Sequence, residues 1–215
     1  MSGGAAGRAE RLGEMVAAVA RQALSDWGAE RVALLDDGSP EAGLAATLLA
    51  PLGPERLARL DVRTDVEPLL HLLPRTHAPE RVGREWARLR MRLEADALSA
   101  APDNKTVLLL GGALPPEPFL PLGDLYASEV AELAGGWSAP EEVRALAEAA
   151  GGIERLDAAL RSLVDRRDPA GVDALLPAGV GDELRRRFER GRASRLTLRL
   201  VPKVGYRTLG VDLFE

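Results

Sequence analysis

Apolar residues recur along the chain at spacings that distinguish helices from strands. Over residues 8–27 they return every three or four positions, which predicts an amphipathic helix. A short continuous apolar run at 32–35 predicts a buried strand, and the small apolar residues at 41–50 predict the next helix, with a proline just before it. The glycine- and alanine-rich residues 1–7 are expected to form a flexible tail. The chain is thus expected to open with a helix–strand–helix unit.

The rest of the chain repeats this alternation of strands and helices. Further strands are predicted at 60–63 and 107–110, and a half-exposed strand at 195–201, where apolar and polar residues alternate. Further helices are predicted at 66–73, 80–100, 124–133, 140–150, 153–164 and 181–190. Strands separated by helices predict an α/β fold with a parallel sheet. We expect one domain over residues 1–215, with residues 191–215 as a C-terminal strand and extension.

Composition narrows the class of protein. Hydrophobic residues make up 46% of the 215 residues, enough for a globular core, and aromatics only 4%, so leucine, valine and alanine must build that core. The net charge of −5 argues against a general nucleic-acid partner, and the absence of cysteine excludes disulfides and thiolate metal sites. No apolar run approaches the roughly 20 residues that span a membrane. The first residues lack the apolar centre of a signal peptide, so a cytoplasmic location is expected.

The loop between the first strand and the next helix has a position that suits an anion. Backbone N–H groups and a helix amino end at the carboxyl end of a strand form a ready phosphate site, and Gly38 and Ser39 are its candidate nucleotide contacts. Yet the loop carries Asp36, Asp37 and Glu41, and carboxylates at that place repel a pyrophosphate. These acids could instead serve as turn and helix-capping residues, or contact a cation.

Two later stretches resemble the ammonia-dependent NAD synthetases, which are ATP pyrophosphatases of the adenine-nucleotide α-hydrolase type. The first, residues 87–93, reads A-R-L-R-M-R-L and is similar to the family's A-R-L-R-M helix. The second is Asn104-Lys105-Thr106 followed by P-L-G-D-L-Y-A-S-E-V-A-E-L-A at 121–134, where the family has G-N-K-T-E and then P-I-G-D-L-Y-K-T-E-V-x-E-L-A. The resemblance implies a three-layer Rossmann-like fold, with the parallel sheet shortened in this chain and a helical C-terminal part.

The resemblance also implies where a nucleotide would bind. Carried over position by position, the candidate cofactor-binding residues are Gly38, Ser39, Asn104, Lys105, Thr106 and Asp124. ATP and magnesium are the implied cofactors if the family's activity is retained. Taken without the resemblance, residues 104–106 also fit a plain polar turn before a strand, and Asp124 fits a helix cap. No residue is assigned a catalytic or metal-binding role.

Four departures from the family pattern change residues that the family uses to bind ATP and magnesium. The phosphate loop S-G-G-x-D-S reads D-D-G-S-P-E here, at 36–41. The strand and glycines before the N-K-T motif are expected to be absent, because the chain runs from Leu98 to Asn104 through Ala100-Ala101-Pro102, and the closing glutamate of that motif becomes Val107. The lysine of G-D-L-Y-K becomes Ala127, and the C-terminal H-K-R signature gives way to an alternating strand near 194–198. Hydroxyl, amide and charged groups that magnesium pyrophosphate needs are lost together.

These losses predict a catalytically degenerate NAD-synthetase-like protein with a residual nucleotide-binding or regulatory role. Two alternatives stay open: an active, divergent synthetase that amidates deamido-NAD with ATP and ammonia, and a structural or assembly partner of a genuine NAD synthetase. The family is homodimeric through long helices, so the resemblance implies a homodimer here as well. Neither a nucleic-acid partner nor a membrane partner is expected.

Overall fold

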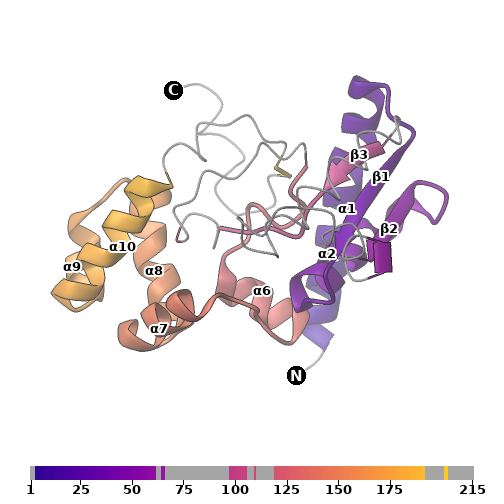
Figure 1. Ribbon diagram of the computed structural model, residues 1–215. Coiled ribbons are helices and arrows are strands. Elements are labelled where there is room, and N and C mark those ends of the chain that lie inside the picture. Colours follow the sequence, from indigo (N-terminus) through magenta and orange to yellow (C-terminus); the bar gives the residue numbers. More distant parts are fainter. Residues whose placement is uncertain are drawn as a thin grey trace, which may run out of the picture.

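Three short parallel strands form the sheet in the described part of the chain, in the order β2–β1–β3 (Figure 1). They are β1 (Arg31–Asp36), β2 (Leu57–Asp61) and β3 (Ala97–Ala100). Val32 of β1 lies opposite Leu57 in β2 and opposite Leu98 in β3. Strand β2 begins before the predicted 60–63. This computed structural model describes residues 3–61, 64–65, 97–105, 109, 119–191 and 201–202.

Two helices share a core with one face of this sheet. They are α1 (Gly3–Trp27) and α2 (Pro40–Leu49), and a short 3-10 helix, η1 (Ala50–Leu52), follows α2. Val32 and Leu34 of β1 are fully buried among the apolar residues of both helices. Ala33 and Leu35, which alternate with them, are buried on the opposite face, because successive side chains of a strand point to opposite sides.

Helix α1 begins at Gly3, which corrects the expected flexible tail over residues 3–7. Two alanines in that stretch favour a helix. Arg8, which follows them, bonds to two glutamates of helix α6 (Ala127–Ala134), at 2.7 and 3.2 Å. Local helix propensity and a contact that is distant in sequence therefore extend the helix beyond the amphipathic stretch.

Strand β3 corrects the carboxyl end of the helix expected at 80–100, because Ala97–Ala100 is extended and pairs with β1. Its apolar residues lie opposite those of β1 and share their core. A segment rich in alanine and leucine fits a helix or a buried strand equally well, and here the pairing with β1 decides. The strand expected to be lost before the N-K-T motif is therefore present. Residues 80–96 lie outside the described residues.

Several other expected elements are corrected or fall outside the described part of the chain. Leu109 is helical and buried, so the strand expected at 107–110 is wrong at that residue. The helix expected at 66–73 lies outside the described residues, and so does the strand expected at 195–201 apart from Val201, which is not in a strand.

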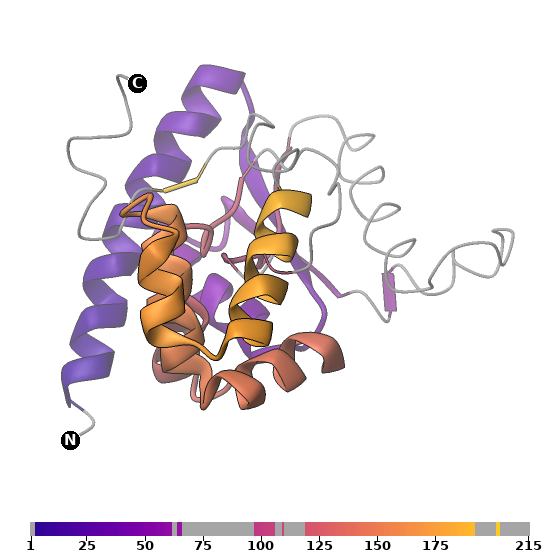
Figure 2. The same cartoon turned by 90° about the vertical axis from the view of Figure 1, so that its left-hand side faces the viewer.

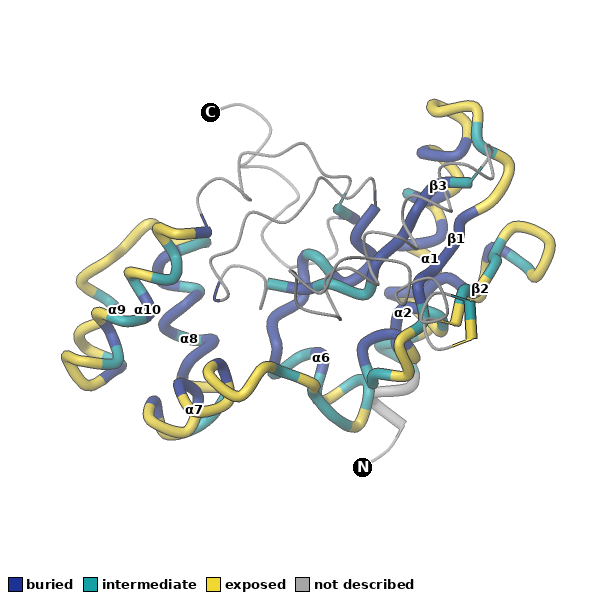
Figure 3. The backbone as a smooth tube through the Cα atoms, in the orientation of Figure 1, coloured by how far each residue is buried: buried dark blue, intermediate teal, exposed yellow. Residues whose placement is uncertain are grey.

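The C-terminal part is helical, as predicted, and is built around a second core (Figure 2). Its helices are α6, α7 (Glu141–Ala150), α8 (Ile153–Val164), α9 (Ala170–Leu175) and α10 (Ala178–Arg190). Val143, Leu156 and Leu160 are buried in this core, while the outer faces of α7, α9 and α10 are exposed (Figure 3). Helix α9 is not predicted, since six residues are too few to establish a helical period.

Helix α6 lies between the sheet-containing part and the remaining helices and contacts α2 on one side and α8 on the other (Figure 1). The run that leads into α6 is tightly packed at Gly123, where a Cβ atom would lie 2.8 Å from Val201 Cγ1. The structure confirms an α/β fold with a short parallel sheet and a helical C-terminal part. Among the described helices, none is long and apolar enough to cross a membrane.

Candidate functional site

The candidate site lies beyond the central strand β1, where one chain connection leads to the strand on one side and the next strand in the chain lies on the other side. From β1 the chain runs through α2 to β2 on one side, and β3 pairs with the other side of β1. In open parallel sheets ligands bind beyond the carboxyl ends of the strands at such a point. Because β1 and β3 are paired, the loops that follow them leave the sheet side by side. The structure therefore brings Gly38 and Ser39 to the same edge of the sheet as Asn104 and Lys105.

The amide groups of the loop after β1 bond to the loop's own side chains. The Gly38 N–H donates to Asp36 Oδ1 at 3.0 Å, and the Ser39 N–H donates to Asp37 Oδ1 at 3.0 Å. The Ala42 N–H donates to Ser39 Oγ at 3.1 Å. Gly38 has a φ of 75°, a conformation that glycine adopts without strain. Asp36 and Asp37 are therefore turn residues, as the turn-and-cap interpretation predicts, whereas the N-cap of α2 is Ser39 and not one of the three acids.

Asp36 also pairs with a cation from the neighbouring strand. Its Oδ2 accepts a hydrogen bond from Arg59 Nε at 3.1 Å and a closer one from a terminal nitrogen of the same guanidinium. Burial raises the pKa of Asp36, but the hydrogen bonds from Arg59 and from the Gly38 amide, together with the Arg59 charge, outweigh burial, so this pKa lies below its usual value. Asp36 is thus ionised at neutral pH, and its charge is balanced within the protein.

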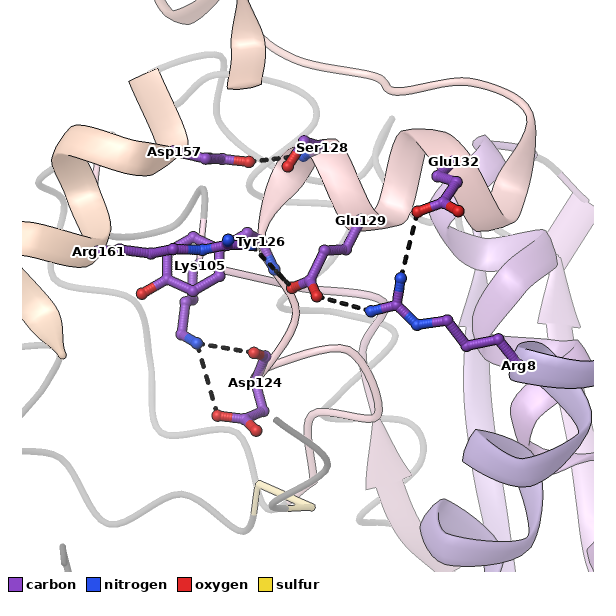
Figure 4. Close-up of polar contacts among 9 residues, drawn as sticks. All are labelled: Arg8, Lys105, Asp124, Tyr126, Ser128, Glu129, Glu132, Asp157 and Arg161. Carbon is purple, nitrogen blue, oxygen red and sulfur yellow. Dashed lines mark hydrogen bonds and ion pairs between the residues drawn. The ribbon is translucent and has the colours of Figure 1, made fainter. Parts of the chain in front are cut away.

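Lys105, in the turn after β3, bonds to the residues that lead into α6 (Figure 4). Lys105 Nζ donates to the Asp124 carbonyl at 2.7 Å and lies 3.5 Å from the Asp124 carboxylate. The Lys105 N–H donates to the Leu125 carbonyl at 3.4 Å. Asn104 and Asp124 are both buried. The predicted residues of this turn and Asp124 therefore lie together, except for Thr106, which is outside the described residues.

Asp124 does not cap α6, which corrects the capping interpretation. The N-cap residue is Tyr126, whose N–H donates to Glu129 Oε2 at 2.9 Å in a capping box. Glu129 also bonds to Arg8 of α1 at 2.7 Å and lies 3.7 Å from Arg161 of α8. An acid three residues after the N-cap is a local sequence signal for Glu129. No local signal identifies Arg8 or Arg161 as its partners.

Tyr126 stands at the junction of the two cores. Leu125 belongs to the core that contains the sheet, and Tyr126 belongs to the helical core. Lys105 Nζ lies 4.0 Å from the centroid of the tyrosine ring, and the guanidinium carbon of Arg161 lies 4.5 Å from it (Figure 4). Burial raises the pKa of Tyr126 well above its usual value, and the Asp165 carboxylate adds to the shift, so the hydroxyl stays protonated. Two cations and one aromatic ring therefore link the turn after β3 to α8.

Asp157 of α8 provides a second link to the amino end of α6. Its Oδ2 accepts the Ser128 N–H at 2.7 Å, and the side chain is buried. Burial raises the pKa of Asp157 above its usual value, although hydrogen bonds from Ser128 and the Arg161 charge oppose the shift. A carboxyl group whose pKa is raised in the folded state favours folding most when protonated, so its contribution falls as the pH rises through the folded-state pKa.

We expect Asp157→Asn to change the pH dependence of stability. The amide keeps an acceptor oxygen for the Ser128 N–H but removes the titration. Between pH 4 and pH 7 the wild-type free energy of unfolding should therefore fall relative to that of the variant, which urea unfolding at both pH values would measure. Glu154→Gln, an exposed acid on the same helix, serves as the control. A constant difference between variant and wild type across this range would contradict the expectation.

The acids of the loop after β1 do not form a cation site in the part of the chain that the structure describes. Asp36 bonds to Arg59 and to the Gly38 amide, and Asp37 bonds to the Ser39 amide. Across the described ranges, no three acidic or histidine side chains converge in a way that could hold a metal ion. The cation-contact alternative for these acids therefore gains no support from the described residues.

The arginines of α10 form an ion-paired helix face. Arg186, Arg187 and Arg190 all bond to Glu183, and Arg185 pairs with two aspartates. The hydrogen bond from Arg187 lowers the pKa of Glu183, although slight burial opposes it, and the neighbouring arginine charges lower it further. Because carboxylates balance these cations, the cluster does not present a free basic surface for nucleic acid.

Most of the chain resembles a known enzyme in its fold. It superposes on the NH3-dependent NAD synthetase from Campylobacter jejuni subsp. jejuni NCTC 11168, solved in complex with the nitrate ion, with a TM-score of 0.56 and 17% sequence identity. The match covers 86% of this chain and 95% of that chain. No protein-family model and no curated protein matches the sequence. The chain therefore has the Rossmann-like fold of an NH3-dependent NAD synthetase, as the two sequence stretches imply.

Proposed function

We propose that this chain is an NAD-synthetase-like protein that no longer cleaves ATP and that has a nucleotide-binding or regulatory role. It would act in the cytoplasm as a homodimer or as the partner of a genuine NAD synthetase. The observation that carries the proposal is the loop after β1, whose amide groups bond to Asp36, Asp37 and Ser39. In a phosphate-binding loop such amide groups point at the ligand instead.

Magnesium pyrophosphate does not fit the described residues at this edge of the sheet. Asp36 and Asp37 would lie beside its negative charges, and two unit charges 4 Å apart repel by about 1 kcal/mol in water and about 4 kcal/mol near a protein surface. Pro40 has no N–H to donate. Lys105, a cation that could offset phosphate charge, is bonded to Asp124. We therefore assign no step of ATP cleavage to these residues.

One observation favours the second candidate, an active and divergent synthetase. Strand β3 still leads to Asn104 and Lys105, and it delivers them to the same edge as the loop after β1. Such an enzyme would adenylylate the nicotinate carboxylate of deamido-NAD with ATP and then transfer ammonia to it. Under the first candidate, the same scaffold is where we expect a residual nucleotide contact, formed by Gly38, Ser39 and the turn after β3.

One pair of measurements separates the two candidates. The protein is incubated with ATP, magnesium, deamido-NAD and ammonia beside an active NH3-dependent NAD synthetase, and the release of pyrophosphate and formation of NAD are followed. We expect neither product above background, and a higher melting temperature with at least one of ATP, AMP, NAD and deamido-NAD. NAD formation that Asp124→Asn abolishes would establish the enzyme instead. No melting shift with any of the four would overturn the nucleotide-binding role.

A further inference from the structure

The segment that joins α6 to α7, residues 135–139, crosses the amino end of α2, and we call it the strap. Alternate residues of the strap meet different parts of the molecule. Gly136 and Ser138 contact α2, whereas Trp137 and Ala139 pack against the helical core. This alternation is typical of an extended chain, in which successive side chains point to opposite sides. The strap therefore lies between the amino end of α2 and the helical C-terminal part.

A buried carboxylate holds the strap to α2. Glu41, in the first turn of α2, is only 7% exposed, and its Oε1 accepts the Ser138 N–H at 2.7 Å. The two residues are 97 positions apart in the sequence. A Cβ atom on Gly136 would lie 3.3 Å from Pro40 Cγ, so the strap backbone passes close to the same turn. A hydrogen bond to a charged acceptor is stronger than one between neutral groups, so this contact helps to hold the strap against α2.

Two buried polar atoms oppose this arrangement. Glu41 Oε2 and Trp137 Nε1 are both buried without a hydrogen-bond partner. A buried polar group without a partner is less stable than the same group in water. Movement of the strap away from α2 would break the bond to Ser138 and would let water reach the buried Glu41 carboxylate. Hydration of this group therefore opposes the loss of the hydrogen bond, which favours a local opening of the strap.

We propose that Glu41 controls a strap that opens and closes over the amino end of α2, beside the carboxyl edge of the sheet. In the closed position the Glu41 carboxylate binds the Ser138 amide and the strap covers the first turn of α2. In the open position the strap leaves this turn, and the helical part is no longer bonded to α2 through Glu41. This device is independent of whether the chain binds a nucleotide or cleaves ATP.

Hydrogen–deuterium exchange of the full chain tests the proposal, with mass spectrometry of peptides that span the strap. In Glu41→Ala we expect the strap amides to exchange at least about tenfold faster, while peptides from the middle of α8 keep their wild-type rates. Glu41→Gln, which keeps an acceptor oxygen, should retain most of the protection. The control is Glu142→Ala, an exposed acid in the first turn of α7, next to the strap.

Four outcomes would overturn the proposal. The first is strap exchange in Glu41→Ala that equals the wild-type rate. The second is faster exchange over the whole chain, because Glu41 would then contribute to global stability and not to a local opening. The third is equal acceleration in Glu142→Ala, which would assign the effect to loss of charge near α7. A glutamine variant as fast as the alanine variant would show that the acceptor oxygen does not hold the strap.

Discussion

Replacing Tyr126 by alanine is expected to lower the free energy of unfolding by about 3–5 kcal/mol, the cost of removing a large aromatic side chain from a core. Tyr126 is 3% exposed and packs in the helical core, so its loss leaves a cavity. The ring also contacts the cations of Lys105 and Arg161. Each cation–ring contact adds about 0.5–2 kcal/mol, and an alanine side chain can form neither of them.

The measurement is urea unfolding followed by far-ultraviolet circular dichroism, with Tyr126→Phe as the matched control. The phenylalanine keeps the ring and both cation contacts, so it should cost less than about 1.5 kcal/mol, the net worth of a single hydrogen bond. Because Tyr126 stands between the two cores, the alanine variant should also broaden the transition or split it in two. A phenylalanine variant as unstable as the alanine variant would show that the hydroxyl, and not the ring, holds this junction.

Local periodicity predicted the helices whose apolar stripe is strong. The helix expected at 153–164 has the bounds of α8, because Leu156 and Leu160 recur at helical spacing after a glycine. The strand at Ala97–Ala100 was missed for the opposite reason. Alanine, leucine and serine fit a buried strand as well as a helix end, and the pairing with β1 that decides between them lies far away in the sequence.

The residues of the candidate site could be named from the sequence, but their contacts could not. The motifs named Gly38, Ser39, Asn104 and Lys105 as nucleotide contacts, and the structure adds that the strands before them, β1 and β3, are paired neighbours. The contacts that decide what this edge can bind are not local. Asp36 meets Arg59 across 23 residues and Glu41 meets Ser138 across 97, so no spacing rule for helices or strands reveals them. Such contacts depend on how β2 and the strap pack.

These contacts predict that two substitutions in the loop after β1 would increase its affinity for pyrophosphate. Asp36→Ser/Asp37→Gly restores the hydroxyl and the glycine of the resembled phosphate loop. The change frees the Ser39 amide, weakens the acceptor for the Gly38 amide and releases Arg59 from its ion pair. Two repulsive charges of about 1–4 kcal/mol each are removed, so the affinity for pyrophosphate should rise by at least about tenfold.

Titration calorimetry with pyrophosphate, with and without magnesium, would measure this gain. The control Asp26→Ser/Glu55→Ser removes the same charge from exposed positions that precede β1 and β2, at the amino edge of the sheet. If both double variants gain affinity equally, the change in net charge and not the loop is responsible. An effect of net charge acts over long distances and depends little on where the charges are removed. If neither double variant gains affinity, the acids of the loop are not what prevents anion binding. Pro40 and the strap would then be the elements that exclude the anion. Pro40 lacks an amide hydrogen, and the strap covers the same end of α2.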